Sequence, residues 1–300
     1  MKKYIKRISI LLIVITIGVL ALIPHMIMGE LLNKRMNVNK EDLTSLNAID
    51  ITLITEDGLS ISAWGVKAVD SKATVILLSG IEKPSITAFK GYSKMLKDSG
   101  YSSLLIEMRA HGDSEGERVA LGMEEYLDVK AGVDYIKKSD TDTQIIVWGT
   151  SMGASTAITA IGMLEDIDGV ISCSAYSSWT DVFCDYLDNM GLPQIITIAE
   201  RPFIDLYIGM KYGFDKLQIS PINKIENLND RPILLAHSTD DSQVPFSSYE
   251  RFIKKLDGEN VKTFVRSGDE HFIYYDEYFE EPELDEEFTT VVLDFLASNF

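Results

Sequence analysis

Two different patterns of apolar residues divide the chain. Residues 8–28 form one apolar run without any Asp, Glu, Lys or Arg, whereas from residue 49 onward short apolar runs alternate with stretches of helical spacing. The first pattern predicts a membrane-spanning helix, because about 20 apolar residues cross a bilayer core. The second predicts an α/β domain, because its period alternates between that of strands and that of helices.

The runs after residue 49 predict a mostly parallel central sheet with helices on both faces. A strand hairpin is expected at 49–55 and 59–66, joined by the Glu-Asp-Gly turn at 56–58. Further strands are expected at 74–78, 103–108, 144–148, 169–175, 232–236 and 261–265. Helices are expected at 85–97, 124–137, 151–164, 247–256 and 284–298. Ligands on such sheets bind at the carboxyl ends of the strands.

These patterns predict the domain boundaries. Residues 1–30 are expected to be the membrane segment, residues 31–48 a linker, and residues 49–300 the main domain. The interval 176–229 interrupts the alternation, since it is long, aromatic and punctuated by prolines, with no buried strand. Loops of this length in a compact domain are usually functional or form small helices. We expect a small helical cap over the strand ends.

The flanks of the apolar run indicate how the chain meets the membrane. Four basic residues precede the run, and it ends in His-Met-Ile-Met-Gly, a poor cleavage site. We expect an uncleaved signal anchor, with a cleaved signal peptide and a buried soluble helix as the alternatives. Basic residues before the span outnumber those at 34, 35 and 40 only modestly, yet they favour a cytoplasmic N-terminus. The expectation is a single-pass protein of the cell membrane with its catalytic domain outside the cytoplasm.

Composition excludes several classes of protein. The 300 residues are 46% hydrophobic and 25% charged, which is ordinary for a folded chain and excludes a disordered protein. With 46 acidic and 28 basic residues, the net charge of −18 disfavours nucleic acid as a partner. Two cysteines are too few for a disulfide framework or a multi-cysteine metal site.

A candidate nucleophile lies between a predicted strand and a predicted helix. The pentapeptide Gly-Thr-Ser-Met-Gly at 149–153 matches G-x-S-x-G, follows the strand at 144–148 and opens the helix at 151–164. This context is that of a nucleophile elbow, in which flanking glycines permit a sharp turn that exposes Ser151. A serine that merely capped a helix would not need a glycine on each side.

The base and the acid are sought further along the chain. In hydrolases with this elbow the partners follow the serine in the order acid, then histidine. Only His237 and His271 follow Ser151. The motif pattern offers no acid on a separate strand end before His237, so His271 is the predicted base. Asp240 and Asp241 both follow the strand at 232–236 and are the candidate acids.

Four segments, in order, resemble the α/β-hydrolase family, in the branch of serine aminopeptidases and monoacylglycerol-lipase-like esterases. They are Ser-Gly at 79–80, Glu-Met-Arg-Ala-His-Gly-Asp-Ser at 107–114, the elbow, and the segment 237–245. The second resembles D-x-R-G-H-G-x-S, and the last resembles H-G-x-x-D-x-x-V-P, which aligns Asp241 with the family's acid. The chain departs from the pattern at Ser79, where the family has His, and at Ala110 and Ser238, where it has Gly.

The resemblance implies a serine hydrolase that cleaves carboxylic esters, short-acyl or lipid-derived, through an acyl-enzyme. It implies that the backbone N–H groups of Ile81 and Met152 form the oxyanion hole, and that neither a metal nor an organic cofactor is needed. Tyr176 and Trp179, just after a strand end, are expected either to line an acyl pocket or to anchor the cap. Arg109 and His111 are expected to brace loops rather than to react.

Two other functions stay open at this point. A peptidase or amidase of the serine aminopeptidase type would use the same residues, and some domains of this fold bind without catalysis. A complete Ser-Asp-His set argues against a binding module, and a serine at position 151 excludes haloalkane or epoxide hydrolysis, which would require Asp there. The expected partners are the ester substrate and, through the N-terminal helix, the membrane; the sequence predicts no oligomeric state.

Overall fold

The computed structural model describes residues 2–32, 34–81, 84–256, 258–274 and 279–300. Its centre is an eight-stranded sheet in the order β1-β2-β4-β3-β5-β6-β7-β8. The strands are β1 (Ile49–Ile54), β2 (Ser60–Val66), β3 (Thr74–Leu78), β4 (Ser102–Ile106), β5 (Ile145–Thr150), β6 (Gly169–Cys173), β7 (Ile233–Ser238) and β8 (Val261–Arg266). The pairs β1–β2 and β2–β4 are antiparallel, and every other pair is parallel. This confirms the predicted α/β-hydrolase fold and its mostly parallel sheet.

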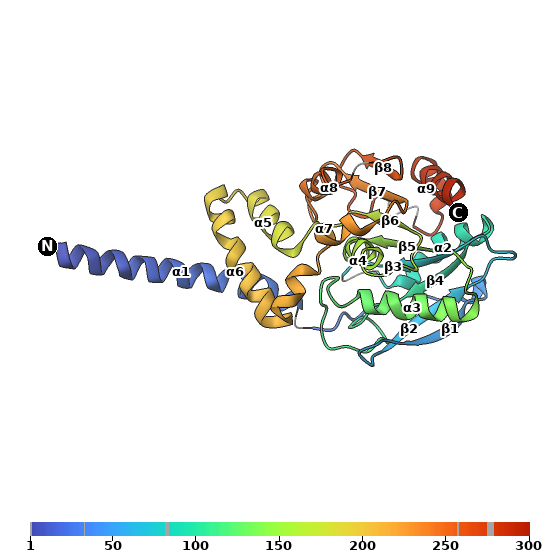
Figure 1. The fold of residues 1–300 in the computed structure, drawn as a ribbon, viewed down its shortest axis with the longest axis horizontal. Helices are drawn as coiled ribbons and strands as arrows, with labels where there is room; N and C mark the ends of the chain where they lie inside the picture. The colour runs from blue at the N-terminus through green and yellow to red at the C-terminus, as the bar shows by residue number, and fades with distance from the viewer. Residues whose placement is uncertain (1, 33, 82–83, 257, 275–278) are drawn as a thin grey trace.

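Helices cover both faces of this sheet. They are α2 (Lys90–Asp98), α3 (Tyr126–Ser139), α4 (Met152–Ile161), α8 (Ser247–Ile253) and α9 (Glu286–Asn299). One apolar layer joins alternate strand residues to α3, α4 and α8, and the other joins the remaining strand residues to α2 and α9. In Figure 1, α3 and α4 lie in front of the sheet. Strand β5 is buried along its whole length because it lies at the centre and is covered on both faces.

Three further helices lie between β6 and β7, in the interval where the sequence predicts a cap. They are α5 (Trp179–Asn189), α6 (Gln194–Tyr212) and α7 (Pro221–Lys224). Short 3-10 helices complete the chain at η1 (Thr44–Leu46), η2 (Ile86–Phe89), η3 (Phe214–Gln218), η4 (Ile225–Asn227) and η6 (Pro282–Leu284). The interval begins at the carboxyl end of β6, so its helices lie at the edge of the sheet where ligands are expected.

A long N-terminal helix, α1 (Lys2–Leu32), projects from the domain (Figure 1). Within it the 27-residue segment Lys3–Gly29 is, by length and composition, long and apolar enough to cross a membrane. Its last turns pack on α6, where the rings of His25 and Tyr207 lie 4.6 Å apart and Met28 is buried.

Candidate active site

Ser151 occupies a strained turn between β5 and α4. Its backbone has φ 52° and ψ −117°, a conformation that non-glycine residues rarely adopt. Two hydrogen bonds hold the turn, from Ser151 N to the Cys173 oxygen at 2.8 Å and from Ser155 N to the Ser151 oxygen at 3.0 Å. The neighbouring strand and the first turn of α4 therefore impose the geometry of a nucleophile elbow.

The two glycines of the elbow are required by close backbone contacts. A Cβ atom on Gly149 would lie 2.1 Å from the Gly153 carbonyl oxygen. A Cβ atom on Gly153 would lie 2.5 Å from the Ser79 oxygen and 2.6 Å from the Leu78 oxygen. The absence of side chains at these positions lets α4 begin directly against the end of β3, next to the loop that contains Ile81.

His271 and Asp241 come together at the carboxyl edge of the sheet. The His271 Nδ1 atom lies 2.8 Å from Asp241 Oδ2 and 3.0 Å from Oδ1. Oδ1 also accepts hydrogen bonds from the backbone N–H groups of Gln243 and Val244, at 2.9 and 2.8 Å. Since a carboxylate accepts, Nδ1 carries the hydrogen, and Nε2 is left as the basic nitrogen. Asp240 is exposed, and its Oδ2 accepts a hydrogen bond from the Thr239 hydroxyl at 3.0 Å.

A second histidine borders the same carboxylate. His237 Nε2 lies 2.8 Å from the Val244 carbonyl oxygen and 3.6 Å from Asp241 Oδ2. Burial lowers the pKa of His237 below its ordinary value, which keeps the ring neutral. The chain order suggests a role for His237 only as a base, whereas in the structure it lies behind the carboxylate of Asp241. Its spacing of four residues from Asp241 was the only sign of that contact.

The loop after β3 lies beside both Ser151 and the residue that follows His271. A Cβ atom on Gly80 would lie 3.6 Å from Ser151 Cβ and 3.2 Å from Phe272 Cε1. Ser151, His271 and Asp241 are all buried, at 8%, 7% and 3% exposure. Within the described part of the chain no hydrogen bond joins Ser151 to His271. Such bonds are often long until substrate binds.

The residues predicted to form the oxyanion hole flank this serine. Met152 is the first residue of α4, so its N–H has no acceptor within the helix and points along the positive end of the helix dipole. Ile81 lies in the loop after β3, and its carbonyl oxygen is 2.7 Å from His111 Nε2. A carbonyl only accepts, so the tautomer of His111 that carries its hydrogen on Nε2 donates to Ile81 and holds its carbonyl group in place.

His111 and Arg109 brace this side of the sheet, as the sequence predicts. His111 Nδ1 lies 2.9 Å from the Arg109 carbonyl oxygen. The Arg109 guanidinium is paired with buried Asp128 at 2.8 Å and with Asp57 at 2.8 Å. These carboxylates raise the pKa of Arg109 above its ordinary value. The hydrogen bond between His111 and Ile81 was not predicted. The only sequence signal for it is that His111 belongs to the family-like motif at 107–114.

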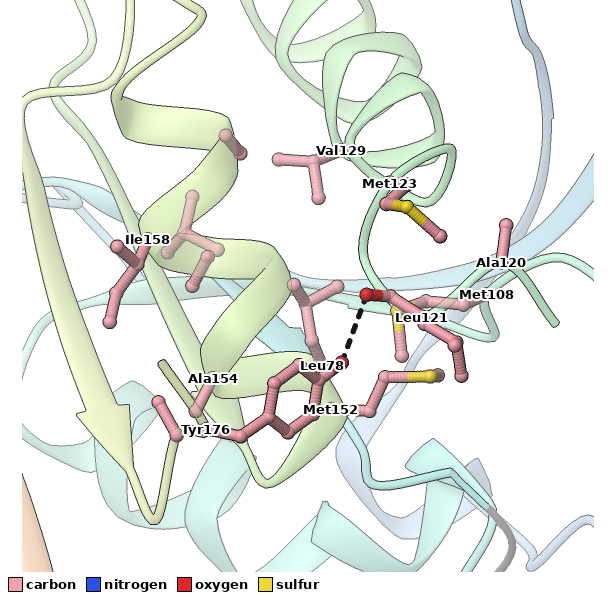
Figure 2. Close-up of a cluster of buried hydrophobic side chains, with 14 of the residues drawn as sticks. Leu78, Met108, Ala120, Leu121, Met123, Val129, Met152, Ala154, Ile158 and Tyr176 are labelled. Atoms are coloured by element: carbon pink, nitrogen blue, oxygen red, sulfur yellow. Dashed lines mark hydrogen bonds between the residues drawn. The ribbon is translucent and has the colours of Figure 1, made fainter. Parts of the chain in front are cut away.

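Tyr176 and Trp179 hold one carbonyl group. The Tyr176 hydroxyl and the Trp179 Nε1–H both donate to the Leu121 oxygen at 3.0 Å, and their rings are 5.0 Å apart. Figure 2 shows the Tyr176 bond within a cluster of buried side chains that includes Met152 and Leu121. Trp179 also lines a cavity of 330 Å³ between α5, α6 and η3. Of the two roles considered, these contacts favour anchoring of the α5–α7 segment.

Among the described residues, no group of three His, Cys, Asp or Glu side chains is arranged to hold a metal ion. The two cysteines are buried and separate, and burial raises the pKa of Cys173 to about 12 and that of Cys184 to about 11. Neither thiol has the environment of a reactive thiolate.

Comparison with known proteins gives matches both to a family model and to individual relatives. A family model described as serine aminopeptidase, S33, matches residues 69–218, which is half of the chain. The uncharacterized protein YqkD of Bacillus subtilis (strain 168) is 27% identical over 222 residues, covering 73% of this chain and 71% of its own. An uncharacterized membrane protein of Saccharomyces cerevisiae, YNL320W, is 26% identical over 145 residues, covering 46% of this chain and 49% of its own.

Solved structures show the same architecture. The Pyrococcus furiosus esterase Pf2001 superposes with a TM-score of 0.68 at 24% identity, covering 89% of this chain and 97% of its own. At that identity the likeness establishes the fold alone.

Proposed function

The chain belongs to the serine aminopeptidase S33 family of α/β hydrolases, and on that premise we propose that it cleaves carboxylic esters through an acyl-enzyme on Ser151. His271 is the proposed base and Asp241 the proposed acid. The observation that carries this proposal is the pairing of His271 Nδ1 with Asp241 at 2.8 Å, at the same sheet edge as the strained elbow serine. A merely structural serine would have no reason to adopt that backbone conformation.

The proposed reaction begins with proton transfer from the Ser151 hydroxyl to His271 Nε2 as the oxygen attacks the ester carbonyl carbon. Asp241 keeps the imidazole in the required tautomer and stabilises its charged form. The N–H groups of Met152 and Ile81 stabilise the oxyanion, with the Ile81 peptide held by His111. His271 then protonates the leaving alcohol, and water hydrolyses the acyl-enzyme with the same base.

A peptidase or amidase activity is the second candidate. It is favoured by the family to which the chain belongs, which is described as serine aminopeptidases. The same residues would attack an amide carbonyl, with His271 protonating the leaving amine. The α5–α7 segment would decide between the two substrate classes, because it covers the carboxyl edge of the sheet.

We further propose that α1 anchors the protein in the cell membrane as a single-pass helix, with residues 31–48 as linker and residues 49–300 as the catalytic domain. The support is an apolar helix of sufficient length and a yeast membrane protein among the relatives. The basic residues ahead of the span support a catalytic domain outside the cytoplasm.

Fluorophosphonate labelling of the full-length protein tests the hydrolase proposal. Wild type should be labelled, and Ser151→Ala should lose both labelling and ester hydrolysis while retaining its circular dichroism spectrum. Ser155→Ala is the matched control, because its hydroxyl in the same helix is bonded to the Tyr176 backbone. Labelling of Ser151→Ala at the wild-type rate would place the nucleophile elsewhere. A panel of p-nitrophenyl esters, monoacylglycerols and aminoacyl amides then separates esterase from peptidase.

A further inference from the structure

Helix α6 presents an apolar stripe to solvent. Five of its exposed side chains are apolar and recur every three or four residues: Ile195, Ile198, Pro202, Leu206 and Met210, continued by Phe214 in η3. Exposed Gln194 and Arg201 lie beside this stripe, and Arg201 is paired with Asp181 at 2.6 Å. The opposite face is buried and includes Ile204 and Ile208. A contiguous exposed apolar patch of this kind marks an interaction surface.

The position of α1 identifies what meets this stripe. Among the described side chains of residues 3–19 all are exposed or nearly so, whereas Pro24 and Met28 are buried where α1 packs on α6. The uncharged run begins at residue 8, and residues 8–19 are about 18 Å long at about 1.5 Å per residue. A bilayer core is about 30 Å thick. The span is therefore completed only by the residues that pack on α6.

The orientation of α6 is consistent with a position at the end of the membrane span. In Figure 1, α6 crosses α1 rather than running alongside it, and the two are in contact through His25 and Tyr207. Since α1 spans the bilayer and α6 crosses it at the end of the apolar run of α1, α6 lies along the membrane surface. Amphipathic helices in that position insert their apolar face about 5–10 Å into the boundary between headgroups and acyl chains.

We propose that the apolar stripe of α6 is a membrane-docking surface that inserts into the same bilayer that α1 spans. This rests on the proposed anchoring by α1. It extends that proposal, because a tether alone would leave the domain free to move above the membrane. Docking through α6 instead holds the carboxyl edge of the sheet, and with it Ser151, against the lipid surface. Substrates would then reach the site from the lipid side.

Quenching by brominated lipid tests this in the full-length protein. One cysteine is added at each of four exposed sites, while the native Cys173 and Cys184 stay buried: Ile198→Cys and Met210→Cys in the stripe, Val14→Cys in α1, and Val69→Cys as the control. Val69 follows β2, whose end pairs with the start of β4, so it lies at the sheet edge opposite the α5–α7 segment. Each variant is labelled with bimane and incorporated at one chain per nanodisc, with brominated or ordinary phosphatidylcholine.

We expect strong quenching at position 14, and quenching at positions 198 and 210 that exceeds the control by about threefold or more, as for groups inserted at the acyl boundary. Quenching at position 14 with no excess at 198 and 210 would overturn docking and leave the anchor standing. No quenching at position 14 would overturn both. Discs that hold two chains test the alternative occupant. If the bimane groups at 198 and 210 are shielded from water only in those discs, the stripe binds a second copy and docking is wrong. Fluorophosphonate labelling in the same discs reports on the hydrolase proposal independently.

Discussion

Two adjacent aspartates occupy different environments in this protein. Asp241 is buried, pairs with His271 and accepts two backbone N–H groups, whereas Asp240 is exposed. Asp241→Asn should lower kcat by several orders of magnitude, because the amide favours the wrong tautomer of His271; a serine protease loses about 10⁴ in kcat through that change. Asp240→Asn should cost less than about tenfold, or about 1.4 kcal/mol of transition-state stabilisation. Ester hydrolysis is measured after both variants are shown to fold by circular dichroism.

The reverse ranking would make Asp240 the acid and would contradict the geometry. Sequence spacing alone selected Asp241, through the likeness of 237–245 to a family pattern. Spacing says nothing of the N–H groups of Gln243 and Val244, which lie on the same short loop and orient the carboxylate. The pairing of residues that are distant in sequence could be predicted only through the family's chain order.

His237 makes stability depend on pH. Its folded pKa lies below the ordinary value of 6.5 because burial disfavours the charged ring. Between these two pKa values His237 is protonated in the unfolded chain and neutral in the folded chain. The free energy of unfolding therefore falls as pH falls from 6.5 toward the folded pKa. His237→Gln keeps a donor for the Val244 carbonyl but does not titrate. Its melting temperature should decline less than that of wild type between about pH 7 and about pH 5, and parallel declines would exclude His237 as a contributor.

At the scale of elements, the strands were predicted more closely than the helices between β6 and β7. Each parallel strand lies within about two residues of its predicted range. In β3 to β7, burial on both faces leaves a nearly continuous apolar run, whereas the edge strand β8 is exposed at three of its six residues. The boundaries of α5 and α6 could not be predicted, since their buried faces pack against each other and α6 also packs on α1. Such partners are remote in sequence, and periodicity does not reveal them.

The elbow depends on the approach of α4 to β3, and Gly153 permits it. In Gly153→Ala the new methyl group would lie 2.5 Å from the Ser79 oxygen, so backbone must move. We expect a loss of about 1–3 kcal/mol in unfolding free energy and a loss of activity, because the displaced loop contains Ile81. Chemical denaturation and p-nitrophenyl ester hydrolysis measure the two effects.

Gly132→Ala in α3 is the matched control for this change. There the methyl group would meet the ends of side chains rather than backbone, at 2.6 Å from Ile106 Cδ1 and 3.3 Å from Leu104 Cδ2, so side-chain adjustment can accommodate it. Alanine also improves helix propensity by up to about 1 kcal/mol, so stability should stay within that range and activity should be retained. If Gly153→Ala proved as mild as Gly132→Ala, the contact between α4 and β3 would not determine the geometry of the elbow.

At the scale of the whole molecule, an apolar helix is joined to a strongly acidic domain. Setting aside residues 1–30 changes 28 basic and 46 acidic residues to 24 and 45, a net charge of −21. Composition and the apolar run predicted this division, but not that the domain rests on α1 through α6. If α1 is an anchor, carbonate extraction should leave the full-length protein in the membrane pellet. Its release at unchanged mass would contradict an anchor, and release at reduced mass would indicate cleavage of residues 1–30.

The proposed orientation of the catalytic domain rests on the charge that flanks the span. Basic residues at 2, 3, 6 and 7 precede it, and positive flanks are retained in the cytoplasm. The catalytic domain should then face away from the cytoplasm. In intact cells, a charged fluorophosphonate that cannot cross membranes should label wild type as fully as a permeant one, and Ser151→Ala should be labelled by neither. If the charged probe labels only after the cells are opened, while the permeant probe labels beforehand, the orientation is reversed. The anchor would then still stand, because a span inserted in the opposite direction resists carbonate equally.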